Sequence, residues 1–162
     1  QRKEVSGAMR QAEPTNVENL VIAARIEKQS GSMDAATRLL DEARSYINEQ
    51  TPAHHVVELA DELYALEKFP DAWPLYERIA DPRVDTHLVK NLLYSYYRSG
   101  ETEKAIQFSK RIPAEHKTPF LLQVELSVLE DIGDLAAASD AAERYLKAHP
   151  DDLQTRVHLA TI

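Results

Sequence analysis

The chain of 162 residues contains no cysteine, so a cysteine nucleophile is excluded and the redox compartment is left open. Its 4 glycines and 8 prolines lie mostly between periodic segments, which argues against a disordered chain. No apolar run approaches the roughly 20 residues of a membrane span, so we expect no membrane insertion of this segment. The localisation stays open between the cytoplasm and a bacterial periplasm.

Several motifs that mark catalytic and nucleic-acid-binding proteins are also missing. The sequence has no GxSxG nucleophile elbow, no Gly-rich phosphate loop and no HExxH pair. The net charge of −8 argues against general nucleic-acid binding, because phosphates must be neutralised by cationic side chains. We therefore expect no catalysis, no cofactor and no nucleic-acid partner.

One cluster resembles a metal-ligand spacing, and it consists of His54, His55, Glu58 and Asp61. Residues four apart share a helix face, but two adjacent histidines point in different directions. We interpret the cluster as a helix N-terminus with exposed imidazoles and expect no metal. His87 and His116 are isolated and are interpreted as surface residues.

The most informative stretch runs from Val89 to Phe108 and reads VKNLLYSYYRSGETEKAIQF. An apolar face recurs at helical spacing through Leu92, Leu93, Tyr96 and Tyr97. Ser99-Gly100 then ends the helix, because glycine accepts the positive φ needed just beyond a helix end. A second amphipathic pattern follows at once, so two antiparallel helices are predicted.

This pattern recurs along the chain at a nearly constant spacing. Small residues early in each second helix mark the period, and they are Ala36, Ala72, Ala105 and Ala138. Successive markers are separated by 36, 33 and 33 residues, and each follows a helix-turn signal. Three of these turns contain glycine, whereas the second has Glu67-Lys68.

The spacing and the paired helices resemble the tetratricopeptide repeat (TPR), whose period is about 34 residues. The resemblance implies an all-α fold in which antiparallel helix-turn-helix units stack into a right-handed superhelix, an α-solenoid. The predicted single domain, 1–162, comprises the tail of a preceding repeat (1–16), four repeats (17–52, 53–85, 86–118 and 119–152) and the start of another (153–162). Glu27, in place of an aromatic residue, departs from the family pattern. So does Glu125-Leu126, which replaces a leucine-small pair and suggests looser packing between helices.

In this family the first helices line a concave groove, and the resemblance implies which side chains face it. The first repeat offers Glu18, Val21, Arg25 and Lys28; the second, His54, Val57, Asp61 and Tyr64; the third, His87, Lys90, Tyr94, Tyr97 and Arg98; the fourth, Phe120, Gln123, Ser127 and Glu130. The predicted partner-binding residues are Tyr64, His87, Lys90, Tyr94, Tyr97 and Arg98, since tyrosine and arginine are enriched at interface hot spots. The alternative is that the tyrosines pack between repeats.

Charge is distributed unevenly among the four repeats, and their net charges in chain order are −2, −5, +3 and −6. A positive repeat between two acidic ones would guide an extended partner, unless the charges only solvate helix faces. The Lys/Asn/Arg clamp with which some TPR proteins grip a carboxylate is not matched, because Tyr94 stands where arginine is needed.

We expect a non-catalytic scaffold that binds a peptide segment or partner protein in the groove. One alternative is an assembly or oligomerisation scaffold of a larger bacterial envelope or secretion protein, for example in exopolysaccharide export, with self-association through exposed repeat ends. The other is the helical regulatory part of an enzyme whose catalytic domain lies outside this segment.

Overall fold

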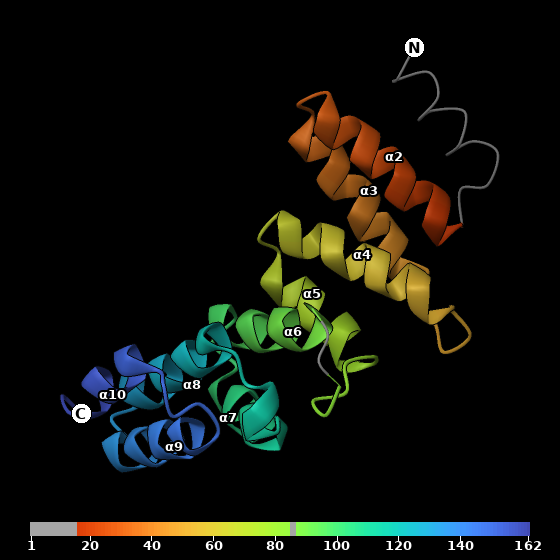
Figure 1. Cartoon of the computed structure of the whole chain (residues 1–162). Coiled ribbons are helices and arrows are strands. Elements are labelled where there is room, and N and C mark those ends of the chain that lie inside the picture. Colours follow the sequence, from red (N-terminus) through yellow and green to blue (C-terminus); the bar gives the residue numbers. More distant parts are fainter. Residues whose placement is uncertain (1–15, 85–86) are drawn as a thin grey trace. The chain divides into compact units, whose positions relative to one another are not determined.

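The computed structural model describes residues 16–84 and 87–162, and this part of the chain is helical without a strand (Figure 1). The expectation of an all-helical chain is confirmed for these residues. The chain divides into two compact units, Gln1–Ile79 and Ala80–Ile162. The predicted repeat tail at 1–16 lies outside the described residues except for Asn16.

The first unit contains four helices: α2 (Val17–Gln29), α3 (Met33–Ser45), α4 (Ala53–Ala65) and α5 (Phe69–Glu77). The Asn16 side chain caps α2 by accepting a hydrogen bond from the Asn19 N–H, at 3.2 Å. Helix α2 packs against α3, α4 contacts both of them, and α5 packs against α4. Ala36 and Ala72 are buried on the second helix of each pair. Side chains of this size let the paired helices approach closely.

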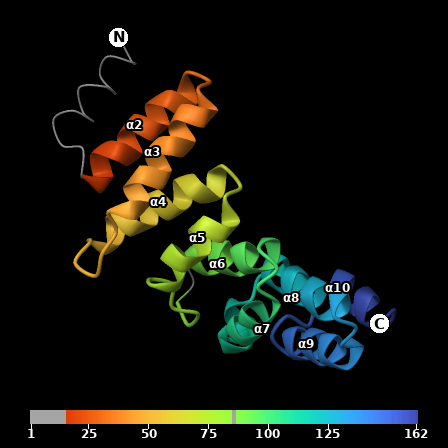
Figure 2. The same cartoon turned by 180° about the vertical axis from the view of Figure 1, so that it is seen from behind.

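The second unit repeats this order of contacts. Its elements are α6 (His87–Arg98), α7 (Thr102–Arg111), the 3₁₀ helix η1 (Ala114–His116), α8 (Pro119–Asp131), α9 (Leu135–Ala148) and α10 (Leu153–Leu159). Helix α6 packs against α7, α8 contacts both, α9 packs against α8, and α10 packs against α9. Figures 1 and 2 show α6, α8 and α10 on one side of this unit, with α7 and α9 on the other.

One hydrophobic cluster fills the space between α8 and α9. It consists of Leu122, Leu126, Leu129, Ala138, Ala141, Ala142 and Tyr145. The leucines come from the apolar face of α8 and the alanines from α9. The large side chains of α8 therefore pack against a surface of small side chains on α9. No helix among the described residues combines the length and apolar character needed to cross a bilayer.

The same hydrogen-bonded turn joins the two helices of every pair. One residue in each turn has a positive φ: Gly31 (83°), Glu67 (57°), Gly100 (72°) and Gly133 (76°). In the third pair the Gly100 N–H donates to Tyr97 O at 3.1 Å, and the Glu101 N–H donates to Tyr96 O at 2.9 Å. This is the Schellman arrangement, and corresponding bonds occur in the other three turns.

A buried ion pair lies just before and within α8. Lys117 Nζ lies 2.6 Å from the Glu125 carboxylate, and the two residues are only 8% and 3% exposed. Glu125 departs from the TPR pattern that the sequence resembles, and the structure gives it a partner eight residues earlier. The pair links the segment that follows η1 to the second turn of α8.

Glu67 is the one non-glycine residue with positive φ in the described chain, so we expect Glu67→Gly to stabilise the protein. A left-handed conformation costs a residue with a Cβ about 1–2 kcal/mol, and part of this gain is offset by the greater freedom of glycine in the unfolded chain. The expected net gain is roughly 0.5–1 kcal/mol in urea unfolding. Gly100→Ala is the matched control and should lose about 1 kcal/mol, because no atom lies within 4 Å of the added Cβ and only the backbone is strained. Equal destabilisation by both changes would contradict this account.

Removing one member of the buried pair should be far more costly than removing both. We expect Lys117→Met to lower the free energy of unfolding by about 3–5 kcal/mol, because the Glu125 carboxylate is left buried without a counter-charge. The double variant Lys117→Met/Glu125→Leu should unfold close to the wild type. Chemical denaturation of the three proteins measures both values. A loss below about 1 kcal/mol in the single variant would show that water reaches the carboxylate.

Candidate functional site

The predicted binding residues of α6 gather on one face of the second unit. Tyr94 and Tyr97 are half-buried, and His87, Lys90 and Arg98 are exposed. The Arg98 guanidinium donates a hydrogen bond to the Tyr94 hydroxyl at 2.9 Å and lies 5.6 Å from the centre of its ring. The rings of Tyr94 and Tyr97 are 6.4 Å apart. Arg98 is thus held one helical turn from Tyr94 with its charge still at the surface.

Phe120 extends this face from α6 onto α8. Its ring lies 5.6 Å from the ring of Tyr94, yet 39% of the residue remains exposed. The exposed phenylalanine beside half-buried Tyr94 extends the aromatic surface, and the Arg98 cation borders it. We call Tyr94, Tyr97, Arg98 and Phe120 the aromatic patch.

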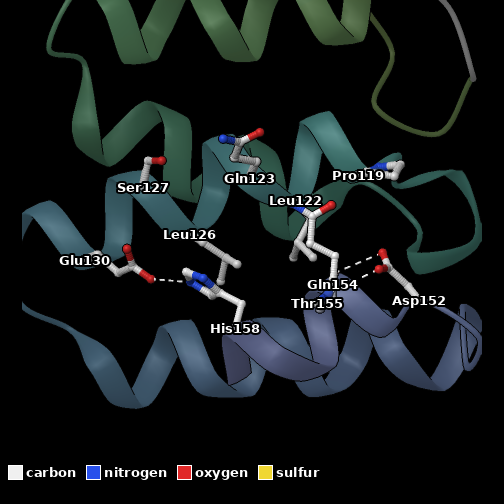
Figure 3. Close-up of a pocket in the computed structure, with 10 residues that line it drawn as sticks. All are labelled: Pro119, Leu122, Gln123, Leu126, Ser127, Glu130, Asp152, Gln154, Thr155 and His158. Atoms are coloured by element: carbon white, nitrogen blue, oxygen red, sulfur yellow. Dashed lines mark hydrogen bonds and ion pairs between the residues drawn. The ribbon is translucent and has the colours of Figure 1, made fainter. Parts of the chain in front are cut away.

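A cavity of about 210 Å³ lies between α8 and α10 (Figure 3). Its walls come from both helices and from the turn that precedes α10. The lining residues are Pro119, Leu122, Gln123, Leu126, Ser127, Glu130, Asp152, Gln154, Thr155 and His158. Three of the residues predicted to face a groove in the fourth repeat, Gln123, Ser127 and Glu130, therefore line one cavity.

Two carboxylates of the cavity have different partners. Glu130 Oε1 on α8 lies 2.7 Å from His158 Nε2 on α10, and Figure 3 shows the two side chains pointing toward each other. Asp152 caps α10, because its carboxylate accepts from the Thr155 N–H at 3.1 Å and the Thr155 hydroxyl at 3.0 Å. The backbone hydrogen bond from Thr155 is the main cause of the lowered pKa of Asp152. Asp152 therefore serves as the N-cap of α10, whereas the Glu130 carboxylate faces the cavity.

The first unit uses its predicted groove residues for contacts between its own helices. Arg25 Nε on α2 lies 2.6 Å from Glu62 Oε1 on α4, and Lys28 pairs with the other oxygen of Glu62. Asp61 accepts a hydrogen bond from the Tyr76 hydroxyl at 2.6 Å. These ion pairs and this hydrogen bond join helices, so they contribute to packing.

Two residues of the predicted groove set lie in packed surroundings in the first unit. Val21 on α2 is fully buried, so the prediction that it faces a groove is wrong. Its helix contacts both α3 and α4. Tyr64 is half-buried, and its ring meets Phe69 and Tyr76 edge-on at 5.3 and 6.3 Å. A partner contact by Tyr64 stays a prediction. Tyr64 belongs to the first unit, whereas the predicted binding residues of α6 belong to the second.

The histidine cluster differs in part from its interpretation. His54 is exposed, but His55 is half-buried, with its ring 3.9 Å from that of His54 and its Nε2 3.9 Å from Glu18. His116, at the end of η1, is half-buried as well, so His55 and His116 are not simple surface residues. Within 16–84 and 87–162 no three His, Asp or Glu side chains are grouped to hold a metal ion.

Sequence reasoning missed the α10 side of the cavity. Gln154, Thr155 and His158 lie 33 residues after Leu121, Leu122 and Glu125, which are all buried in α8. Gln154 and Thr155 stand one repeat after Leu121 and Leu122. This replacement of leucines by polar residues was a usable signal that the surface of α10 is more polar. Glu62 was missed too, and its pairing with α2 spans 34–37 residues.

The comparisons with family models and with curated proteins yield no relative from which a function could be transferred. No family model matches the chain, and no curated protein gives a significant match.

The Glu62 ion pairs should make the stability of the protein depend on pH in the acidic range. Burial raises the pKa of Glu62, but hydrogen bonds and charge from Lys28 and Arg25 outweigh burial and hold it below its ordinary value. The stabilisation is therefore present above the pKa of the unfolded carboxyl and is lost as the pH falls through the folded value.

We accordingly expect Glu62→Gln to lower the free energy of unfolding by about 1–2 kcal/mol at pH 7 and by much less at pH 3.5. Urea unfolding at both pH values tests this. Glu143→Gln, which removes an exposed carboxylate from α9, is the control and should shift little at either pH. If Glu62→Gln lowers the free energy of unfolding as much at pH 3.5 as at pH 7, the ion pairs are not the cause of the lost stability.

Proposed function

We propose that this chain is a non-catalytic interaction module that binds an extended segment of a partner protein along α6, α8 and α10 of the second unit. One observation carries the proposal. The exposed or half-exposed residues Phe120, Gln123, Ser127 and Glu130 follow one face of α8. This stripe begins at the aromatic patch and continues to the cavity beside α10.

The chemistry of this surface suits a peptide. Tyr94 and Tyr97 offer large contact area with little side-chain entropy to lose, and Arg98 offers a planar donor group. Lys90 and Arg98 add positive charge at the α6 end, whereas Glu130 lies at the other. A partner segment with an acidic or aromatic residue near α6 and a basic residue near α10 would complement both ends.

The resemblance to TPR proteins supports the same proposal. In that family the first helix of each pair faces the ligand, and here the corresponding helices are α6, α8 and α10. Four helix pairs with Schellman turns at residues 31, 67, 100 and 133 agree with the spacing from which the resemblance was inferred. The function is inferred from the surface, since a fold by itself does not define a ligand.

The experiment is selection of peptides from a displayed random library on the immobilised protein, followed by titration of the selected peptides. Tyr97→Ala, Arg98→Ala and Phe120→Ala should each weaken binding by about 5- to 150-fold, or roughly 1–3 kcal/mol, as expected for interface anchors. Lys147→Ala removes an exposed cation from α9 and should leave the affinity unchanged. Circular dichroism checks that each variant keeps its helices.

Two results would contradict the proposal. The first is that the library yields no peptide that competes for a common site. The second is that selected peptides bind equally well after Arg98→Ala and Phe120→Ala, which would place the binding surface elsewhere.

The assembly alternative is favoured by a separate observation on α10. Leu153 and Val157 lie four residues apart on this helix and are 69% and 67% exposed, so they present an adjacent apolar pair. Light scattering across a concentration series decides this alternative. A mass that grows with concentration in the wild type, and not in the double variant Leu153→Glu/Val157→Glu, would support assembly. A constant monomer mass would exclude self-assembly through this pair.

A further inference from the structure

We propose that the cavity between α8 and α10 binds the side chain of a single arginine of the partner segment, with Glu130 as the carboxylate that holds it. This inference rests on the proposed function and identifies the chemistry of one of its contacts.

The size of the cavity favours one side chain over a free small molecule. Its volume is about 210 Å³, below the range of about 300–1,000 Å³ that is typical of small-molecule sites. Its lining is suited to a long side chain with a polar end. Leu122 and Leu126 offer apolar contact for methylene groups, while the Glu130 carboxylate and the Gln154 amide offer acceptors for N–H groups.

The charge around the cavity selects a cationic group. Glu130 and Asp152 both line it, and His158 is the lining residue that can oppose them. Asp152 already accepts two hydrogen bonds from Thr155, so Glu130 is the carboxylate with more accepting capacity. Its bond to His158 occupies one oxygen, Oε1, and leaves Oε2 for an incoming donor. An acidic side chain would be repelled by both carboxylates.

Arginine fits this arrangement better than lysine. Its planar guanidinium presents several N–H donors at once, so it can bond to Oε2 of Glu130 and still offer donors to other groups. It is also less strongly hydrated than an ammonium group, which lowers the cost of entering a cavity with an apolar floor.

The position of Glu130 along α8 predicts the spacing of the partner's residues. Phe120 and Glu130 are ten residues apart on one helix, and at 1.5 Å per residue this is about 15 Å. An extended peptide covers that distance in about four to five residues. A segment lying along α8 would therefore carry its arginine four to five positions from the acidic or aromatic residue that meets the aromatic patch.

The first experiment uses the whole chain and N-acetyl-L-arginine amide as the probe. In NMR titrations we expect saturable shifts of the His158 ring and the Gln154 side-chain amide. N-acetyl-L-citrulline amide has nearly the same shape without the charge and should bind at least tenfold more weakly. Glu130→Gln should abolish the preference while retaining a hydrogen-bonding partner for His158, and Glu143→Gln on α9 should leave it intact. Equal shifts with both compounds, or unchanged arginine binding in Glu130→Gln, would overturn the proposal.

The second experiment separates this inference from the proposed function. In a selected peptide, replacing arginine by citrulline should weaken binding about tenfold to the wild type and little to Glu130→Gln. Peptides that depend on Phe120 and Arg98 but not on Glu130 would overturn the arginine site and leave the proposed function standing. Saturable, Glu130-dependent binding of the arginine amide, with no peptide selected, would support the site and overturn the proposed function.

Discussion

Each of the four helix pairs depends on a reversal of the chain within three residues, and that reversal requires one residue with positive φ. The Schellman bonds satisfy carbonyls at the end of the first helix while turning the chain back along it. Because the second helix starts immediately, its buried alanines meet the apolar face of the first helix. The second pair makes the same turn with Glu67, which shows that the packing of the pair outweighs the backbone cost of a residue with a Cβ.

The two units use the exposed side of their first helices differently. In the first unit, Arg25 and Lys28 on α2 both reach across to Glu62 on α4, so these charges pair within the unit. In the second unit, the corresponding side of α6 and α8 carries aromatic rings and Arg98, and a cavity separates α8 from α10. The proposed binding surface therefore lies on the second unit.

The buried Lys117–Glu125 pair also bears on that surface. Lys117 directly precedes Thr118, whose side chain caps α8 by accepting from the Leu121 N–H at 3.2 Å. A cap and an ion pair therefore hold the beginning of α8, and Phe120 lies within this anchored turn. An exposed aromatic residue on an anchored helix end loses less conformational entropy on binding than one on a free loop.

Much of the helical framework was predictable from sequence, because apolar periodicity and turn glycines are local signals that can be read within one helix pair. The turns at Gly31, Gly100 and Gly133, the unusual turn at Glu67-Lys68 and the buried alanines all follow from such local signals. The resemblance to TPR proteins predicted that Gln123, Ser127 and Glu130 face a groove, and these residues line the α8 side of the cavity. Tertiary structure alone decided that Val21 is buried, that Glu62 pairs with Arg25 and Lys28, and that His158 meets Glu130 across 28 residues. These contacts join side chains on different helices, and they depend on the rotation and axial shift of one helix against another, which helical periodicity does not specify.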